Sequence, residues 1–345
     1  MQLPREVIVG DNIIDSIGDV CRRLGFSKSI LVVMGPKTQD IVGQRIIEIL
    51  NASNFKVDQF VATSSTLWDI RAVEEKIGGL RPQVVLGVGG GTMIDVAKLS
   101  SSRRGVSFIS VPTTASHDGI ASPLCSIKGL DKPYSVLAQA PMAILADTSI
   151  IIKASHRFTA SGCGDIMAKL TAVRDWKLAH TVRHEYYGEY AASLALMSAK
   201  LVMKNADKIK PGGEEGLRVL LEALISVGVA MSIAGSSRPG SGSEHLFSHA
   251  LDLITPKLAL HGEQCGVGAI MMARLHNMNW GKIRDTLRKV GAPTTAKELG
   301  LEPEHVVKAL VRSCSIRPDR YTILDEQPLN HNSAEKLARS TGVID

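Results

Sequence analysis

The first half of the chain alternates short apolar runs with stretches whose apolar positions recur at helical spacing. The β-branched runs have the continuous apolar character of parallel strands buried on both faces. The predicted strands are 29–34, 56–62, 84–88, 107–111 and 142–147. Helices are predicted between them, as at 38–51 and 70–79. This βαβ alternation predicts an α/β fold class, with a doubly wound, Rossmann-like parallel-sheet domain over residues 1–152.

After about residue 150, strand-like runs disappear and long helical patterns replace them. The predicted helices are 162–180, 187–207, 214–235, 244–253 and 262–275. We therefore expect an all-α domain over residues 153–345. The most apolar stretch, 219–234, contains Glu222 and is too short to cross a membrane. It is interpreted as a buried helix, and no membrane span is expected.

Composition narrows the class of protein. A chain of 345 residues with 44% hydrophobic side chains can bury a large core. The net charge of +6 favours anionic ligands in general, but the basic residues are dispersed and no basic run is interleaved with aromatic residues. Nucleic-acid binding is therefore not expected. Five cysteines without a C-x-x-C pair argue against a disulfide framework and a zinc ribbon, and indicate reduced thiols in the cytoplasm.

The segment 84–98 is typical of a strand, a glycine turn and the start of a helix. Gly89, Gly90 and Gly91 would let the backbone approach a pyrophosphate, whose charge the helix N-terminus attracts. Thr92 stands where a G-x-G-x-x-G fingerprint would end, so the turn alone is equally compatible with a connection that binds nothing. A second loop of small hydroxyl residues, 111–123, follows the next predicted strand and favours a nucleotide site.

A second group of residues has the chemistry of a metal site. His245 and His249 are four residues apart, so on a helix they share a face, and His261 follows near the start of another predicted helix. Asp165 is predicted near a helix start, where by itself it could be only a cap. Imidazole and carboxylate ligands with an open position suit a catalytic zinc. The same histidine spacing recurs in the charged stretch 180–184, so spacing alone is weak evidence.

Four segments, taken together and in this order, resemble the archaeal sn-glycerol-1-phosphate dehydrogenase family. They are Gly-Gly-Gly-Thr-Met-Ile-Asp-Val-Ala-Lys (89–98), Pro-Thr-Thr-Ala-Ser-His-Asp-Gly-Ile-Ala-Ser-Pro (112–123), Ser-Gly-Cys-Gly-Asp (161–165) and Ser-Arg-Pro-Gly-Ser-Gly-Ser-Glu-His-Leu-Phe-Ser-His-Ala-Leu (237–251). That family is grouped with glycerol dehydrogenase, the iron-containing alcohol dehydrogenases and 3-dehydroquinate synthase. The resemblance extends over essentially the whole chain.

The resemblance implies specific roles for these residues. Asp165, His245 and His261 would bind Zn²⁺, while Asp118 and His249 would be catalytic and would bind the substrate together with Asp165. The residues implied to line an NADH or NADPH cofactor are Gly89, Gly90, Gly91, Thr92, Met93, Ile94, Asp95, Thr113, Thr114, Ala115, Ser116 and Ser122. The active site is expected in a cleft between the two domains.

The implied reaction is the reversible reduction of dihydroxyacetone phosphate to sn-glycerol 1-phosphate, which supplies the backbone of archaeal ether lipids. The metal would polarise the carbonyl, Asp118 would hold a substrate hydroxyl, and His249 or a water would supply the proton. Lys169 stands where iron-dependent relatives carry a fourth, histidine ligand, so zinc is favoured. Lys37 follows the first predicted strand and would tolerate the 2′-phosphate of NADPH. Arg238 and Lys169 are candidates for binding the substrate phosphate.

Several alternatives stay open at this point. A glycerol dehydrogenase acting on an unphosphorylated polyol is the nearest one. A 3-dehydroquinate synthase would normally carry glutamate at position 165, so Asp165 speaks against it. A catalytically inactive nucleotide-binding regulator could keep the same fold. The partners expected are a phosphorylated small molecule and further copies of the chain in a homo-oligomer.

Overall fold

The computed structural model describes residues 2–126, 135–255 and 259–345. The chain divides into two compact units. Unit 1 comprises Met1–Ala115 and Gly119–Ser155, and unit 2 comprises Ser116–Asp118 and His156–Asp345. Unit 1 is an α/β structure and the described part of unit 2 is helical, which confirms the predicted fold class. The functional assignment of residues 1–152 and 153–345, and the cleft expected between them, stay predictions.

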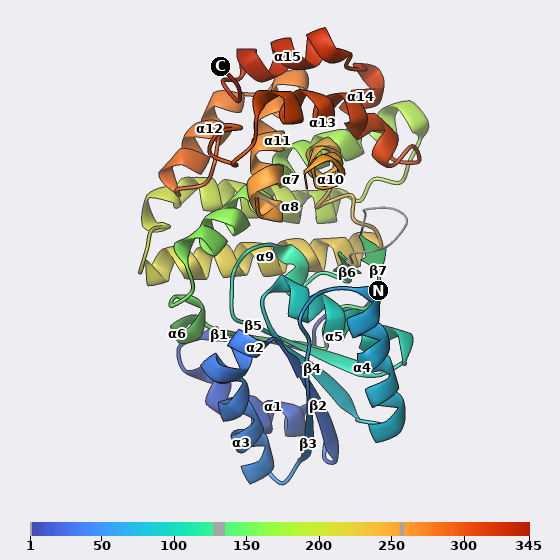
Figure 1. Ribbon diagram of the computed structural model, residues 1–345, viewed down its shortest axis with the longest axis vertical. Helices are drawn as coiled ribbons and strands as arrows, with labels where there is room; N and C mark the ends of the chain where they lie inside the picture. Colours follow the sequence, from blue (N-terminus) through green and yellow to red (C-terminus); the bar gives the residue numbers. More distant parts are fainter. Residues whose placement is uncertain (1, 127–134, 256–258) are drawn as a thin grey trace. The chain divides into compact units, whose positions relative to one another are not determined.

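Unit 1 is built on a six-stranded parallel sheet with strand order β1-β8-β5-β4-β2-β3 (Figure 1). The strands are Glu6–Gly10 (β1), Ser29–Met34 (β2), Lys56–Val61 (β3), Val84–Gly89 (β4), Ser107–Pro112 (β5) and Ala143–Asp147 (β8). Five of the six coincide with predicted strands to within one residue at each end. The edge strand β1 was not predicted, because its five residues are mostly half-buried and form only a short apolar run.

Helices cover both faces of this sheet, which explains why its central strands are apolar throughout. Alternate residues of β2, namely Ile30, Val32 and Met34, pack in one cluster with side chains of α1 and α3. On the opposite face, a Cβ at Gly87 would contact Phe108 and the α5 residue Ala97. The helices of unit 1 are Ile17–Arg23 (α1), Pro36–Thr38 (α2), Gln44–Ala52 (α3), Leu67–Leu80 (α4), Gly91–Arg103 (α5) and Thr148–Ile151 (α6).

Several short elements are irregular. A 3₁₀ turn, Ile13–Ser16 (η1), precedes α1, and a second, Asp118–Ile120 (η3), begins at the last residue of the 116–118 segment of unit 2. A π-helical turn, Gln39–Gly43 (η2), occupies the start of the helix predicted at 38–51. Leu124–Cys125 (β6) and Val136–Leu137 (β7) form a separate antiparallel pair.

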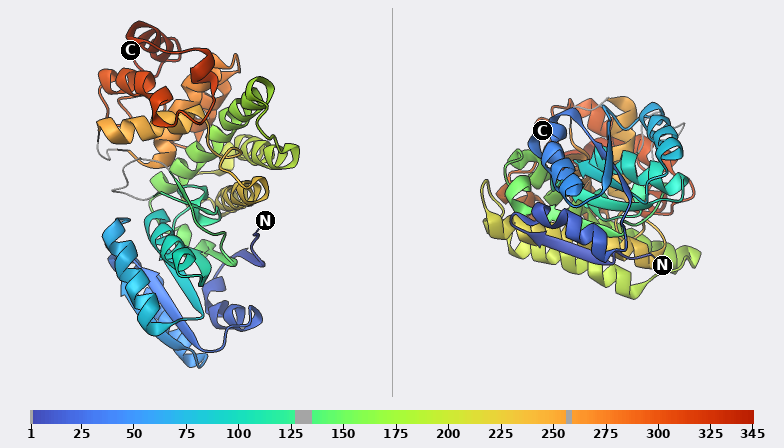
Figure 2. Two further views of the ribbon diagram at one scale, coloured as in Figure 1. Left: turned by 90° about the vertical axis from the view of Figure 1, so that its right-hand side faces the viewer. Right: turned by 90° about the horizontal axis from the view of Figure 1, so that it is seen from below.

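Unit 2 consists of packed helices, which run from green to red in Figure 2. They are His156–Arg183 (α7), Glu189–Lys204 (α8), Ala206–Lys208 (η4), Glu214–Ala234 (α9), Ser243–Ile254 (α10), His261–Leu275 (α11), Trp280–Lys289 (α12), Pro303–Ile316 (α13), Ile323–Glu326 (α14) and His331–Ser340 (α15). Helix α9 has the length and hydropathy of a membrane span. However, 61% of its most apolar window is buried, and it packs against α7 and α8 as a core helix would.

One close contact within unit 2 positions the candidate site. Helices α7 and α11 approach each other at Gly164 and Gly262. A Cβ placed on Gly164 would lie only 2.1 Å from the carbonyl oxygen of Gly262, so these backbones pack as closely as they do only because both residues lack side chains. Asp165 follows Gly164 on α7, and His261 precedes Gly262 on α11. The contact between the two glycines therefore brings Asp165 near His261.

Candidate metal and nucleotide sites

The glycine turn of unit 1 has a backbone that requires glycine. Gly89 has a φ of +149°, and a Cβ there would lie 2.9 Å from the Cβ of Met93. Gly90 is the N-cap of α5, and its carbonyl oxygen accepts from the Met93 and Ile94 amides, so the amides of Gly91 and Thr92 are the ones that could face an anion. The phosphate cradle at this turn stays a prediction.

The two predicted nucleotide loops lie side by side at the carboxyl ends of β4 and β5. The Thr113 amide donates to the carbonyl oxygen of Gly89 over 2.9 Å, and a Cβ on Gly90 would lie 3.3 Å from Thr114 Oγ1. Thr38, the neighbour of Lys37 in α2, also approaches this turn, because its Oγ1 would be 3.3 Å from a Cβ on Gly89. The exposed Lys37 therefore lies on a helix next to the glycine turn.

Not all predicted cofactor residues can present side chains to a ligand. Met93 and Ile94 are buried in the interior, so they could contribute only backbone groups. The Asp95 carboxylate is buried and accepts from the Ser126 amide over 2.9 Å, which ties a neighbouring loop to α5. Ser122 is also buried. Thr92 is exposed, and Ala115 is buried beside Thr114.

Ser116 belongs to unit 2 together with the Asp118 predicted to bind substrate. The Ser161 hydroxyl of α7 donates to the Ser116 carbonyl oxygen over 3.1 Å, and the Asp118 amide donates to Asp165 Oδ2 over 2.8 Å. These bonds fix residues 116–118 against the helix that carries Asp165. They explain why the short segment packs with unit 2.

The three predicted metal ligands come together from three helices of unit 2. His245 Nε2 of α10 lies 3.6 Å from Asp165 Oδ1 of α7, and the ring centroids of His245 and His261 are 5.0 Å apart. Each imidazole has its Nδ1 near a partner: Glu244 Oε1 at 2.8 Å for His245, and Ser248 Oγ at 3.2 Å for His261. Such outer contacts orient metal-binding histidines and leave Nε2 for the ion. The donor set therefore fits a zinc ion.

Cys265 joins this cluster, although it was not among the predicted metal ligands. Its Sγ lies 3.6 Å from His261 Nε2, and the ligand atoms of His245, His261 and Cys265 all lie within 4.8 Å of one another. Burial holds the pKa of the Cys265 thiol well above its usual range, so the group is neutral in this environment. The signal that could have revealed it is the H-x-x-x-C spacing on α11.

Lys169 is a central residue of the site and not a ligand. Its Nζ lies 2.6 Å from Asp165 Oδ1, 2.7 Å from Asp118 Oδ2 and 3.0 Å from the Gly240 carbonyl oxygen, and the side chain is fully buried. A lysine one helical turn after Asp165 therefore joins the predicted zinc ligand to the predicted substrate residue. All three ionisable groups lie within unit 2.

The charges in this cluster shift one another's pKa values. Burial alone would raise the pKa of Asp165, but Lys169, His245 and His261 together hold it well below its usual range. Burial would lower the pKa of Lys169, and the two carboxylates raise it instead. Burial and the neighbouring Asp165 raise the pKa of Asp118. Lys169, Asp118 and Asp165 form an ion triad. Within it, Asp165 stays a carboxylate, the form that binds a metal.

His249 lies one helical turn after His245, and its ring stacks near that of His261 at a centroid distance of 6.2 Å. Burial, followed by the charges of His245, Arg317 and Arg320, lowers the pKa of His249 to about 3. Burial also holds the pKa of His261 well below its usual range. Both imidazoles are therefore neutral near pH 7.

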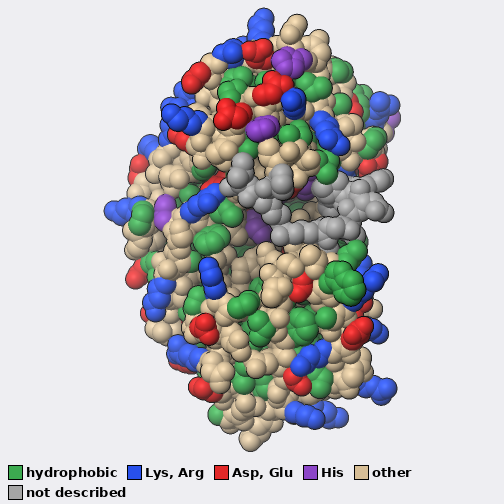
Figure 3. Space-filling view, in the orientation of Figure 1, with side chains coloured by type: hydrophobic (Ala, Val, Ile, Leu, Met, Phe, Trp, Pro, Cys, Tyr) green, Lys and Arg blue, Asp and Glu red, His purple; other side chains and the backbone are tan. Residues whose placement is uncertain are grey.

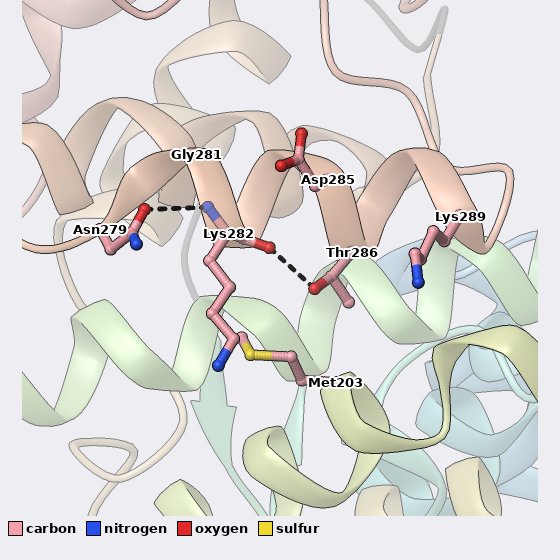
Figure 4. Close-up of a pocket in the computed structure, with 7 residues that line it drawn as sticks. All are labelled: Met203, Asn279, Gly281, Lys282, Asp285, Thr286 and Lys289. Atoms are coloured by element: carbon pink, nitrogen blue, oxygen red, sulfur yellow. Dashed lines mark hydrogen bonds between the residues drawn. The ribbon is translucent and has the colours of Figure 1, made fainter.

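On the face drawn in Figure 3, basic side chains alternate with acidic ones among the described residues. A hollow of about 360 Å³ on unit 2 is lined by Met203, Asn279, Gly281, Lys282, Asp285, Thr286 and Lys289 (Figure 4). None of these is a predicted site residue. Lys289, one of the lining residues, forms an ion pair with Asp207 at 2.9 Å.

Comparison with known proteins identifies relatives along the whole chain. Residues 8–155 match the family described as iron-containing alcohol dehydrogenase. The glycerol-1-phosphate dehydrogenase [NAD(P)+] of Pyrococcus furiosus is 54% identical over 344 residues, covering 100% of this chain and 99% of the relative. The protein of the same name from Methanosarcina mazei is 53% identical, covering 100% of this chain and 96% of the relative.

Solved structures with the same fold include more distant proteins. Glycerol dehydrogenase from Schizosaccharomyces pombe superposes with a TM-score of 0.82 at 20% identity, covering 98% of this chain and 89% of that one. Sulfoacetaldehyde reductase from Bifidobacterium kashiwanohense, in complex with NAD+, gives a TM-score of 0.77 at 19% identity, covering 100% and 98%. At these identities the likeness shows the fold alone.

Proposed function

We propose that this chain, which belongs to the glycerol-1-phosphate dehydrogenase family, catalyses the reversible reduction of dihydroxyacetone phosphate to sn-glycerol 1-phosphate with NADH or NADPH. The product would supply the backbone of archaeal ether lipids. The observation that carries the proposal is the meeting of Asp165, His245 and His261 in a chain 54% identical to a relative of that name over its whole length.

Asp165, His245 and His261 would hold a zinc ion. Zinc there would supply Lewis-acid polarisation of the carbonyl, while a nicotinamide cofactor, its pyrophosphate held at the glycine turn of unit 1, would supply the hydride. Lys169 supports zinc over a four-ligand iron site, because its ammonium group binds two carboxylates and has no lone pair to offer a metal.

The protein's own side chains would position the substrate beside these three residues. Lys169 binds one oxygen of Asp118, which leaves the other oxygen to accept a hydrogen bond from a substrate hydroxyl. His249 is neutral near pH 7, so it would orient the substrate through its ring N–H and pass on a proton taken from water. A homo-oligomeric state and a cytoplasmic location stay predictions.

The proposal is tested by following NADPH oxidation by zinc-loaded protein with dihydroxyacetone phosphate and, separately, with unphosphorylated dihydroxyacetone. The product enantiomer is then determined with stereospecific glycerol phosphate oxidising enzymes. We expect a strong preference for the phosphorylated substrate and formation of the sn-1 product. A preference for the unphosphorylated ketone would instead identify a polyol dehydrogenase, and no turnover with either would identify an inactive relative.

A further inference from the structure

Three arginines of unit 2 gather beside the loop that precedes α10. Arg238 binds both carboxylate oxygens of Glu185, and Arg317 lies 3.4 Å from Asp319 Oδ2. Arg320 differs from both, because in the part of the chain that the structure describes no carboxylate lies within ion-pair distance of its guanidinium. The cluster therefore contains one more guanidinium than carboxylates.

Arg320 is buried, with only 7% of the residue exposed, and its hydrogen-bond acceptors are neutral. Its Nη1 donates to the Ser241 carbonyl oxygen and its Nη2 to the Ser237 hydroxyl, each over 2.5 Å. A guanidinium has five N–H donors, so about three remain for a ligand. Buried charges in proteins are normally paired, so an arginine with no carboxylate partner among the described residues is suited to bind an anion.

The electrostatic environment of Arg320 shows the same excess of positive charge. Burial lowers its pKa to about 9, and the positive charges of Arg317 and Arg238 add to this effect against the weaker opposing influence of Glu185 and Asp319. Burial and the neighbouring positive charges therefore disfavour the cationic form of Arg320. An anion bound at this position would offset that effect.

Arg320 adjoins the candidate active site through the loop 237–241. The carbonyl oxygen of Gly240 accepts from Lys169 Nζ, and the next carbonyl, that of Ser241, accepts from Arg320. A Cβ on Gly240 would lie 3.4 Å from Asp118 Oδ2. The charges of Arg317 and Arg320 also act on His249. Arg320 therefore borders the same residues that would bind the substrate.

We propose that Arg320, assisted by Arg317, is the phosphate-binding subsite that selects a phosphate monoester as substrate; this inference rests on the proposed function. A guanidinium forms two parallel, charge-assisted hydrogen bonds with a phosphate, a geometry that an ammonium group cannot reproduce. Arg238 and Lys169, the candidates from the sequence, already bind Glu185 and the two aspartates. Arg320 has the donors and the unbalanced charge that this role requires.

The test compares Arg320→Gln with Arg312→Gln, an exposed arginine of the neighbouring helix α13, as the matched control. Loss of a charge-assisted contact predicts a KM for dihydroxyacetone phosphate raised about 10- to 100-fold. The kcat/KM for unphosphorylated dihydroxyacetone should stay within about twofold of the wild type. Arg312→Gln should leave both substrates unaffected.

Inorganic phosphate provides a readout that needs no turnover. It should raise the melting temperature of wild-type holoenzyme and compete with dihydroxyacetone phosphate, and both effects should be lost in Arg320→Gln. If that variant does not fold, Arg317→Gln, whose side chain is 21% exposed, and Arg320→Lys replace it, with an expected KM increase of about 3- to 10-fold.

An unchanged KM for the phosphorylated substrate in the folded variants overturns the proposal. So does an equal loss of kcat/KM for both ketones, which would indicate a structural role. If the wild type does not reduce dihydroxyacetone phosphate at all, the proposed function fails, and the phosphate titration alone decides whether Arg320 binds the anion.

Discussion

Replacing Lys169 by methionine would remove the ammonium group that lies between Asp118 and Asp165. The side chain is fully buried, so no solvent replaces the lost charge, and the two carboxylates are left next to each other. Breaking a buried ion pair from one side typically costs about 3–5 kcal/mol. Methionine keeps most of the side-chain volume, so a cavity contributes little to the loss.

This cost can be converted into a melting temperature. For a cooperative unit of the size of unit 2, which spans Ser116–Asp118 and His156–Asp345, each 1 kcal/mol shifts the midpoint by roughly 2–4 °C. The Lys169→Met variant should therefore melt about 6–20 °C below the wild type at pH 7.5. The matched control is Lys200→Met on the exposed face of α8, for which we expect a shift within about 2 °C.

The difference in melting temperature between the wild type and Lys169→Met should also depend on pH. The pKa of Lys169 is raised, so its stabilising contribution is fully present below about pH 10.4 and does not change between pH 5 and 8. The pKa of Asp165 is lowered in the wild type, so its contribution is present above about pH 3.9 and is lost only below that. In the variant, one of the adjacent carboxyls should take up a proton as the pH falls to 5, and the difference should narrow.

The assay is differential scanning calorimetry of chelator-treated protein at pH 5.0 and 7.5, with circular dichroism to establish that the variant is folded. Chelation matters because a bound cation would itself compensate the two carboxylates. A variant that melts with the wild type at both values of pH would refute the ion triad. If the difference in melting temperature were larger at pH 5.0 than at pH 7.5, the destabilisation could not come from two unpaired carboxylates.

Four further substitutions test the metal site and the nucleotide site. His261→Ala should abolish zinc retention and turnover, whereas Cys265→Ala should keep at least half of the bound zinc by elemental analysis; the reverse result would make the thiol the ligand. Lys37→Asp should raise the KM for NADPH about tenfold or more while changing that for NADH little, and equal effects on both would refute 2′-phosphate recognition. Gly89→Ala should weaken nucleotide binding at least tenfold, measured by cofactor fluorescence, because the added Cβ would lie 2.9 Å from Met93; unchanged binding would show that the turn is not the cradle.

The fold was largely predictable from local pattern. Buried parallel strands such as β2, Ser29–Met34, are apolar on both faces and bounded by turn residues, so their limits could be predicted. The edge strand β1, Glu6–Gly10, has a weaker signal, since it is recognised only through pairing with β8, far along the chain. The π-helical turn at Gln39–Gly43 has no signature that separates it from an α-helix.

The candidate site was predictable where a motif carried it. The pairing of Asp165 with Lys169 follows from their i,i+4 spacing, but the addition of Asp118 depends on tertiary packing of residues 116–118 against α7. Arg320 lies in no recognisable motif, and its partners are 79 and 83 residues away. Contacts at such separation are set by the packed structure and not by local sequence.

The central claim is that a metal held by Asp165, His245 and His261 is required for reduction of the phosphorylated ketone. The most direct measurement is the rate of NADPH oxidation with dihydroxyacetone phosphate, taken with zinc content on one sample before chelation, after chelation and after zinc is restored. We expect about one zinc per chain, a rate that is lost with the metal and returns with it, and sn-glycerol 1-phosphate as product. Undiminished turnover by protein shown to be free of metal would contradict the account.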